Sequence, residues 1–139
     1  MKRIILGLSV LLMLVQNVVA NESDDMDYVN SKKNQPALYQ FMLCVNETTY
    51  HQNNGNVNIC LKAVQYIKQG KDLGFLSDKR EEELGQAYLK TAVLYQVSEK
   101  NYVKAYEYYM KTAKTNTDAS KIAQQNLDIL CNQHSWVCK

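Results

Sequence analysis

The apolar residues of segment 84–113 recur every three or four positions, which is the spacing of an amphipathic helix. This spacing predicts two helices joined by a short polar turn. The apolar stripe of the second helix consists of Tyr102, Ala105, Tyr106, Tyr109 and Ala113. The first helix has two stripes, made of Leu84, Tyr88, Thr91 and Tyr95 and of Leu89, Val93 and Val97. A helix that is apolar on two sides must be covered on two sides, so further helices are predicted to pack beyond this hairpin.

The flanking segments are predicted to supply those helices. Helical spacing gives boundaries of about 36–47, about 58–69, and from Thr117 or Asp118 to about Cys131. Gly70 is expected to be a left-handed C-terminal cap, and Ser77 or Asp78 to cap the first helix of the central hairpin. One Pro, five Gly and no persistent strand alternation predict an all-α class. The predicted fold over 36–139 is a short α-solenoid of two helical hairpins and a C-terminal capping helix, preceded by a flexible polar lead-in at 21–35.

The first twenty residues have the three parts of a secretory signal peptide. Lys2 and Arg3 form a charged start, 4–15 is an apolar run, and Ala20 is a small residue suited to cleavage. An uncleaved membrane anchor is the alternative, although the apolar run is shorter than the roughly 20 residues that a membrane span needs. The interpretation is a periplasmic or secreted protein.

The charge balance of the predicted mature chain argues against two classes of partner. Removing residues 1–20 takes away two of the 16 basic residues and none of the 14 acidic ones, which leaves 14 of each. Nucleic acids and anionic membranes both select a net basic surface. We therefore expect neither nucleic-acid binding nor stable membrane insertion after cleavage.

All four cysteines follow the predicted cleavage point, and an even count in an exported chain favours two disulfides. Three pairings are possible, and Cys44–Cys60 with Cys131–Cys138 is preferred because each pair is close in sequence and flanks a turn. A zinc site built on Cys131, His134 and Cys138 is the alternative. Cα atoms seven residues apart in a helix are separated by about 10.5 Å, so the disulfide requires the last helix to end before Cys138. Trp136 is then expected to pack onto the end of the domain.

An internal repeat with an offset of 42 residues relates segments 59–69 and 101–111. Lys62-Ala63 aligns with Lys104-Ala105, and Tyr66-Ile67 with Tyr108-Tyr109. On these residues, together with Ala92, Tyr95 and Ala113, the chain resembles the Sel1-like and tetratricopeptide (TPR-like) class of helical repeats. The resemblance implies protein–protein binding on a helical face, and it provides no catalytic residues to transfer.

No set of residues typical of catalysis is found in the sequence. His51 lies in an Asn-rich loop with no evident acidic or nucleophilic partner, and the 81–83 glutamates are typical of a solvated helix start. We therefore expect no enzymatic activity, metal ion or cofactor. A small hydrolase or a metal-dependent enzyme that uses His51, His134 and the glutamates is the least favoured alternative.

The residues selected as a protein-binding set are Tyr66, Tyr108 and Trp136, because aromatic residues are enriched in recognition surfaces. Both tyrosines lie off the apolar stripes and at equivalent positions of the repeat. The hypothesis is an exported helical-repeat protein that binds another protein, with an immunity protein that blocks a toxic enzyme as the concrete role. An envelope adaptor or assembly factor is the alternative.

Overall fold

The computed structural model describes residues 22–70 and 79–139, and this part of the chain is entirely helical. Its elements are α2 (Glu22–Asn30), α3 (Pro36–Tyr50), α4 (Val57–Gln69), α5 (Arg80–Val97), α6 (Tyr102–Ala113), α7 (Asp118–Gln133) and the short 3-10 helix η2 (Ser135–Cys138). The all-α prediction is confirmed for these residues. The predicted signal peptide and the predicted caps Ser77 and Asp78 lie outside them.

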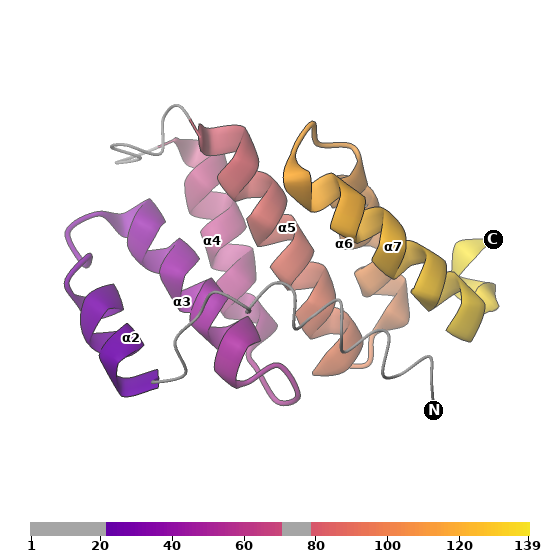
Figure 1. The fold of residues 1–139 in the computed structure, drawn as a ribbon, viewed down its shortest axis with the longest axis horizontal. Coiled ribbons are helices and arrows are strands. Elements are labelled where there is room, and N and C mark those ends of the chain that lie inside the picture. Colours follow the sequence, from indigo (N-terminus) through magenta and orange to yellow (C-terminus); the bar gives the residue numbers. More distant parts are fainter. Residues whose placement is uncertain (1–21, 71–78) are drawn as a thin grey trace.

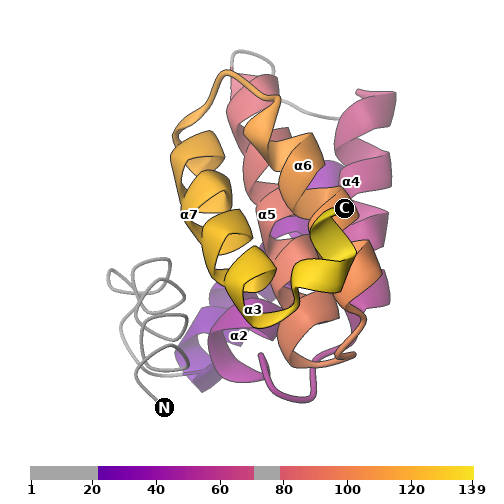
Figure 2. The ribbon, with the colours of Figure 1, turned by 90° about the vertical axis from the view of Figure 1, so that its right-hand side faces the viewer.

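Helix α5 lies at the centre of the molecule and contacts α3, α4, α6 and α7. Successive helices run antiparallel, with α3, α5 and α7 in one layer and α4 and α6 in the other (Figures 1 and 2). The order of two hairpins followed by a final helix is the predicted one. Helix α2 lies at one end of the row and η2 at the opposite end (Figure 1).

The two apolar sides of α5 are buried against different partners, as the sequence pattern predicts. Leu89 and Val93 are fully buried in a cluster with α6 and α7, whereas Leu84 and Tyr88 of the other stripe pack with Val64 and Ile67 of α4. Leu94, which is in neither predicted stripe, is buried with Cys44 and Cys60 of α3 and α4. Burying a side chain of this size contributes on the order of 1.5–3 kcal/mol. Helix α5 therefore joins the two halves of the molecule through its side chains.

The repeat alignment pairs residues with the same burial. Ala63 and Ala105 are both fully buried, and so are Ile67 and Tyr109. A small residue lets neighbouring helices approach closely, and the bulky residue four positions later fills the space beside it. The equivalence of α4 and α6 is therefore visible in their packing.

Local capping chemistry explains where several helices begin and end. The Asn56 side chain accepts from the amide of Asn58 at 3.0 Å, and Asn101 accepts from Lys104 at 3.1 Å, which caps the N-termini of α4 and α6. Gly70 has a φ of 71°, which confirms the predicted left-handed cap. Helix α5 begins at Arg80, whose guanidinium donates to carbonyls in the last turn of α4.

Segment 21–35 contains a helix where a flexible lead-in was predicted, so that prediction is wrong for its described part. Helix α2 packs along α3, and Val29 is buried there. Three acidic residues in its first turn suit the positive end of the helix dipole. The error arose because a segment with so few apolar residues is stabilised here by polar contacts with residues far away in sequence.

Both predicted disulfides are present. Cys44–Cys60 joins α3 to α4 with its Cα atoms 4.6 Å apart, and both cysteines are fully buried. Cys131–Cys138 joins the end of α7 to η2 with its Cα atoms 5.7 Å apart. The pair that a continuous helix would have kept apart is brought together because α7 ends at Gln133 and the chain turns back.

Candidate functional site

The C-terminal end of the molecule is held in shape by an aromatic stack as well as by a disulfide. His134 is the C-cap residue that follows α7, and its ring stacks on Tyr102 at the start of α6 with a centroid distance of 3.8 Å and an interplanar angle of 17°. Helix η2 contacts both α6 and α7 (Figure 2). The His134 imidazole, considered above as a zinc ligand, therefore packs against α6. The zinc alternative is wrong because Cys131 and Cys138, its two sulfur ligands, are joined in a disulfide and are not free thiolates.

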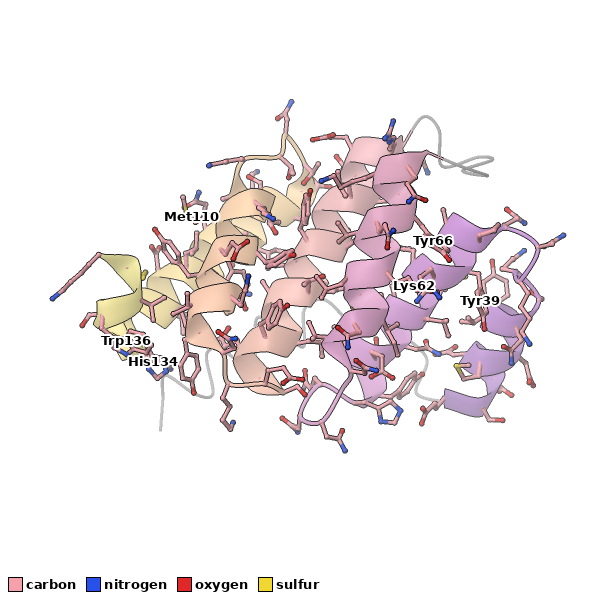
Figure 3. All side chains as sticks on the ribbon, turned by 180° about the vertical axis from the view of Figure 1, so that it is seen from behind. Tyr39, Lys62, Tyr66, Met110, His134 and Trp136 are labelled. Atoms are coloured by element: carbon pink, nitrogen blue, oxygen red, sulfur yellow. A yellow bond between two sulfur atoms is a disulfide. The ribbon has the colours of Figure 1, made fainter. Side chains whose placement is uncertain are left out.

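Large apolar side chains are exposed at this end. Trp136 is 60% exposed and Val103 is 54% exposed, whereas the other large apolar side chains of the described chain, apart from Tyr28, are at least partly buried. Figure 3 shows Trp136 and His134 together at the C-terminal end of the molecule. The expectation that Trp136 packs onto the domain is wrong. The four-residue η2 turns this side chain outward, and His134 occupies the place against α6.

We call this region the C-terminal surface and define it by Tyr102, Val103, His134, Trp136 and Val137. It combines two properties of protein-binding surfaces. Its backbone is fixed by covalent and stacking contacts, and its exposed side chains include an aromatic residue with large apolar area. Sequence reasoning selected Trp136 but missed Val103, which lies opposite the buried stripe of α6 and gives no signal other than being apolar at a polar position.

Tyr108 belongs to a cluster of tyrosines between α5 and α6. Its ring centroid lies 5.6 Å from that of Tyr95 and 6.1 Å from that of Tyr88. The Lys111 ammonium lies 4.5 Å from the centre of the Tyr108 ring, within cation–π distance. Burial raises the pKa of both Tyr95 and Tyr108. Much of the Tyr108 ring is therefore engaged inside the molecule, and its binding role stays a prediction.

Tyr66 lies in the equivalent position on α4 and has an equivalent environment. It packs beside Ala37, Leu38 and Met42 of α3, and the Lys62 ammonium lies 5.6 Å from its ring centre. Figure 3 places Tyr66 and Lys62 at the opposite end from Trp136. The structure therefore does not bring the three predicted binding residues onto one surface.

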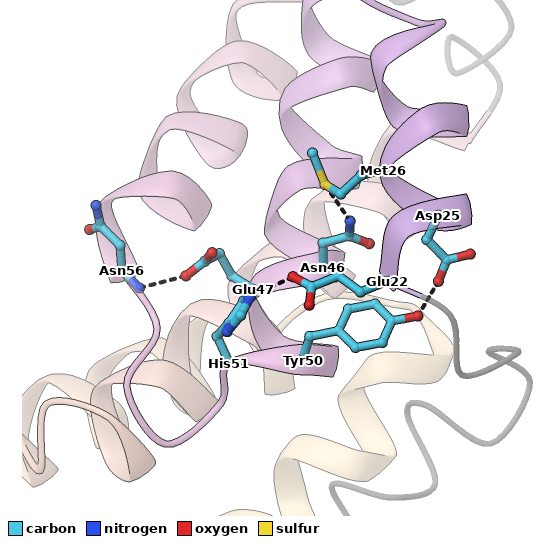
Figure 4. Close-up of polar contacts among 8 residues, drawn as sticks. All are labelled: Glu22, Asp25, Met26, Asn46, Glu47, Tyr50, His51 and Asn56. Carbon is cyan, nitrogen blue, oxygen red and sulfur yellow. Dashed lines mark hydrogen bonds and ion pairs between the residues drawn. The ribbon is translucent and has the colours of Figure 1, made fainter.

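His51 has an acidic partner that the sequence did not reveal. Its Nε2 lies 2.6 Å from Oε1 of Glu22, at the start of α2 (Figure 4). The neighbouring Tyr50 hydroxyl donates to the Asp25 carboxylate, which raises the pKa of Tyr50 to about 12, and the Asn46 amide donates to the Met26 sulfur at 2.8 Å. These pairs hold α2 against α3, so the role of His51 in the structure is to position a helix.

Lys90 is a buried charged residue that sequence reasoning missed. Only 6% of it is exposed, and its ammonium donates to the Gln86 side chain at 3.0 Å. Burial lowers the pKa of Lys90 to about 8, opposed in part by the charge of Glu83, whose own pKa burial raises. Lys90 is three residues after Ala87 and four before Leu94, both on the side of α5 that faces α3 and α4, but this spacing alone does not show that a lysine between them is buried.

The described residues contain no group of three or more His, Cys, Asp or Glu side chains placed to hold a metal ion. Among them, no helix has the length and apolar character to cross a membrane. No protein-family model matches this chain, and no similar curated protein or solved structure was found. The contacts described above are therefore the basis for the function proposed below.

Proposed function

We propose that this chain is a small exported protein that binds another protein through its C-terminal surface. The observation that supports this most directly is the exposure of Trp136 on a segment fixed by a disulfide and by the Tyr102–His134 stack. An exposed tryptophan on a rigid support loses little conformational freedom when a partner covers it, so more of its apolar contact energy appears as affinity. Val103, also exposed, follows the stacked Tyr102 at the start of α6.

Export to the periplasm or beyond agrees with the covalent chemistry of the chain. Two disulfides with no free cysteine among the described residues indicate an oxidising, non-cytoplasmic environment. The first twenty residues have the sequence pattern of a secretory signal peptide, which supports the same proposal. Helices α4 and α6 bury equivalent residues of the repeat. This equivalence supports a module of the Sel1-like or TPR-like kind, whose members bind proteins.

The concrete role that we propose is an immunity protein that inhibits a toxic enzyme. Small size, covalent staples and a rigid apolar tip suit a tight one-to-one inhibitor. If so, expressing the chain should protect cells from an enzyme encoded by an adjacent gene, and the purified pair should form a 1:1 complex. An envelope defect on deletion, with no such protection, would contradict the inhibitory role.

The binding surface is tested by measuring affinity with matched variants. The mature chain should recover a stoichiometric protein partner from a periplasmic extract after crosslinking. Replacing Trp136 by Ala should weaken that complex by about 30-fold, the effect of removing a hot-spot aromatic residue. Tyr28→Ala is the control, because Tyr28 is similarly exposed, at 57%, but belongs to α2 at the other end of the molecule. Equal losses for the two variants, or failure to recover any partner, would contradict the proposal.

A further inference from the structure

The two disulfides have different access to solvent. Cys44 and Cys60 are fully buried and packed with Val57, Ala63 and Leu94. Cys131 and Cys138 are both partly exposed, at the margin of the C-terminal surface. Reduction of a disulfide begins when a thiolate reaches one of its sulfur atoms. Cys131–Cys138 is therefore the more accessible disulfide to a reductant in solution, whereas Cys44–Cys60 can be reached only after α3 and α4 separate.

The accessible disulfide also holds a segment that has few other contacts. None of the four residues of η2 is buried. Apart from the disulfide, this end is held by the Tyr102–His134 stack, by packing of η2 on α6 and α7, and by short-range backbone hydrogen bonds such as that from the Val137 amide to the His134 carbonyl at 3.0 Å. A four-residue 3-10 helix is not stable by itself. Breaking the sulfur–sulfur bond would remove the strongest constraint on Trp136.

We propose that Cys131–Cys138 is a redox switch that controls the C-terminal surface, while Cys44–Cys60 stays oxidised as a structural bond. The reductant is a dithiol, either a small molecule or a dithiol oxidoreductase. Its thiolate attacks one sulfur, forms a mixed disulfide and expels the other cysteine as a thiolate, and its second thiol then displaces the first cysteine. Two electrons and two protons pass to Cys131 and Cys138, and the reductant becomes a disulfide.

Reduction has a defined structural consequence. The end of the chain from Ser135 onward becomes free to move, and His134 loses the constraint that keeps it on Tyr102. The helices from α3 to α7 stay packed, because their contacts and the buried disulfide do not involve η2. Under the proposed function, on which this consequence for binding rests, the reduced protein presents Trp136 on a mobile tail and binds its partner more weakly.

The selectivity is tested by alkylation of the folded mature protein. The protein is incubated with increasing dithiothreitol without denaturant, quenched with iodoacetamide and mapped by peptide mass spectrometry. We expect carbamidomethyl groups on Cys131 and Cys138 at dithiothreitol concentrations at least tenfold below those that label Cys44 and Cys60. Simultaneous labelling of all four cysteines, or earlier labelling of the buried pair, would overturn the proposal.

The release of η2 is tested on the same samples. Trp136 is the only tryptophan, so its fluorescence anisotropy reports this segment alone. Anisotropy should fall on selective reduction, contacts between the Tyr102 and His134 rings should disappear from NMR spectra, and helical circular dichroism should persist. The double variant C131S/C138S should reproduce the reduced state. An unchanged anisotropy after complete reduction of Cys131–Cys138 would overturn the switch.

Partner binding separates this inference from the proposed function. Reduction should weaken a recovered complex at least tenfold. If η2 is released while the complex keeps its affinity, the C-terminal surface is not the binding site. The proposal that Cys131–Cys138 controls partner binding is then overturned. If no partner exists, the proposed function fails, but selective reduction and release remain measurable on the protein alone.

Discussion

Lys90 shows how a single buried charge affects the stability of a small helical protein. An ammonium group taken out of water loses hydration that one neutral hydrogen bond to Gln86 only partly replaces. The nearby Glu83 carboxylate offsets some of this loss, and the net result is a pKa lowered from 10.5 to about 8. Between these two values the folded state therefore binds fewer protons at this site than the unfolded state does.

The first prediction concerns the pH dependence of unfolding. Because the unfolded state binds more protons, the free energy of unfolding should rise as the pH increases from 8 towards 10, on the order of 2–3 kcal/mol for a shift of this size. This rise in the free energy of unfolding should end near pH 10. Burial raises the pKa of Tyr109, so above pH 10 the unfolded state loses this proton more readily than the folded state and stability falls. Urea titrations at several pH values measure the slope.

Replacing Lys90 by Met is the matched test of that slope. The variant should be more stable than the parent at pH 7 and should lose most of the rise between pH 8 and 10. Lys121→Met on the exposed side of α7 is the control, and it should change neither property. A Lys90→Met variant with the parental pH slope would show that another group is responsible.

Side-chain burial in α5 could be predicted from the sequence only for its apolar residues. The two stripes correctly placed Leu89 and Val93 in the core because apolar spacing determines which sides of a helix need cover. The same spacing left Lys90 between them as a polar residue and therefore as an expected surface residue. Its burial depends on how closely the neighbouring helices approach, which periodicity does not encode.

Helix α2 is the element held most by polar contacts. Only Val29 of its nine residues is buried, whereas Glu22, Asp25 and Met26 each pair with a side chain of α3 or of the residue that follows it. An isolated helix of this length is not stable in water. We therefore place α2 at the low-stability end of the molecule, where local opening precedes global unfolding.

The second prediction concerns the contact between Tyr50 and Asp25. Replacing Tyr50 by Phe should increase hydrogen exchange of the α2 amides at least several-fold, while α5 and α6 keep their protection. The parent should show the same loosening at alkaline pH. The pKa of Tyr50 is raised to about 12, so its contribution is present below pH 10 and is lost as the pH rises from 10 to 12.

The control for this prediction is a second tyrosine of α3. Tyr39→Phe on the same helix should leave exchange in α2 unchanged, since Tyr39 has no side-chain hydrogen bond to α2 among the described contacts. If Tyr50→Phe instead accelerates exchange throughout the described helices, α2 is part of the global folding unit. The idea of a locally opening helix would then be wrong.

The elements could be predicted from the sequence where local chemistry determines them. The side chains of Asn56 and Asn101 cap the N-termini of α4 and α6. The αL conformation of Gly70, at the C-terminus of α4, follows from its position after an apolar run. Helix α2 could not be predicted, because its partners lie 20 to 29 residues away, as in the Asn46–Met26 and His51–Glu22 pairs. Such contacts are visible only after α3 is placed.

The whole molecule is stabilised unequally by its two covalent links. Cys44–Cys60 closes a 16-residue separation and lies inside the core that joins α3, α4 and α5. Cys131–Cys138 closes a separation of seven residues at the edge. The pairing was predicted from sequence proximity, but the difference in depth was not, because burial of Cys44 and Cys60 depends on the cover given by Leu94.

The third prediction compares the removal of each link. The double variant C44A/C60A should lose about 3 kcal/mol of unfolding free energy, the chain-entropy value for a loop near this size, and further stability from the space left in the core. The C131A/C138A variant should lose about 2 kcal/mol or less, since a shorter loop is opened and no buried residue of η2 is lost. Guanidinium titrations of the two variants measure the difference, and equal losses would contradict it.

The residue types proposed for binding could be selected from the sequence, but their positions in the fold could not. Aromatic residues were selected, and of these Trp136 is the one that is exposed, so it is the one on which the proposed surface rests. Tyr66 and Tyr108 could not be excluded from the same surface by their sequence positions, because the repeat makes them equivalent and says nothing about the distance to the C-terminus. The fold puts Tyr66 at the opposite end (Figure 3).

The outward side of α7 limits how this architecture could be enlarged. Lys121, Gln124, Gln125 and Asp128 are exposed there, while Ala123 and Leu127 face the core. A further hairpin grafted after α7 would meet hydrated charges and amides instead of an apolar groove, and it would not dock. An engineer who wished to lengthen the protein would first have to make this outward side apolar, or insert new units between α4 and α5.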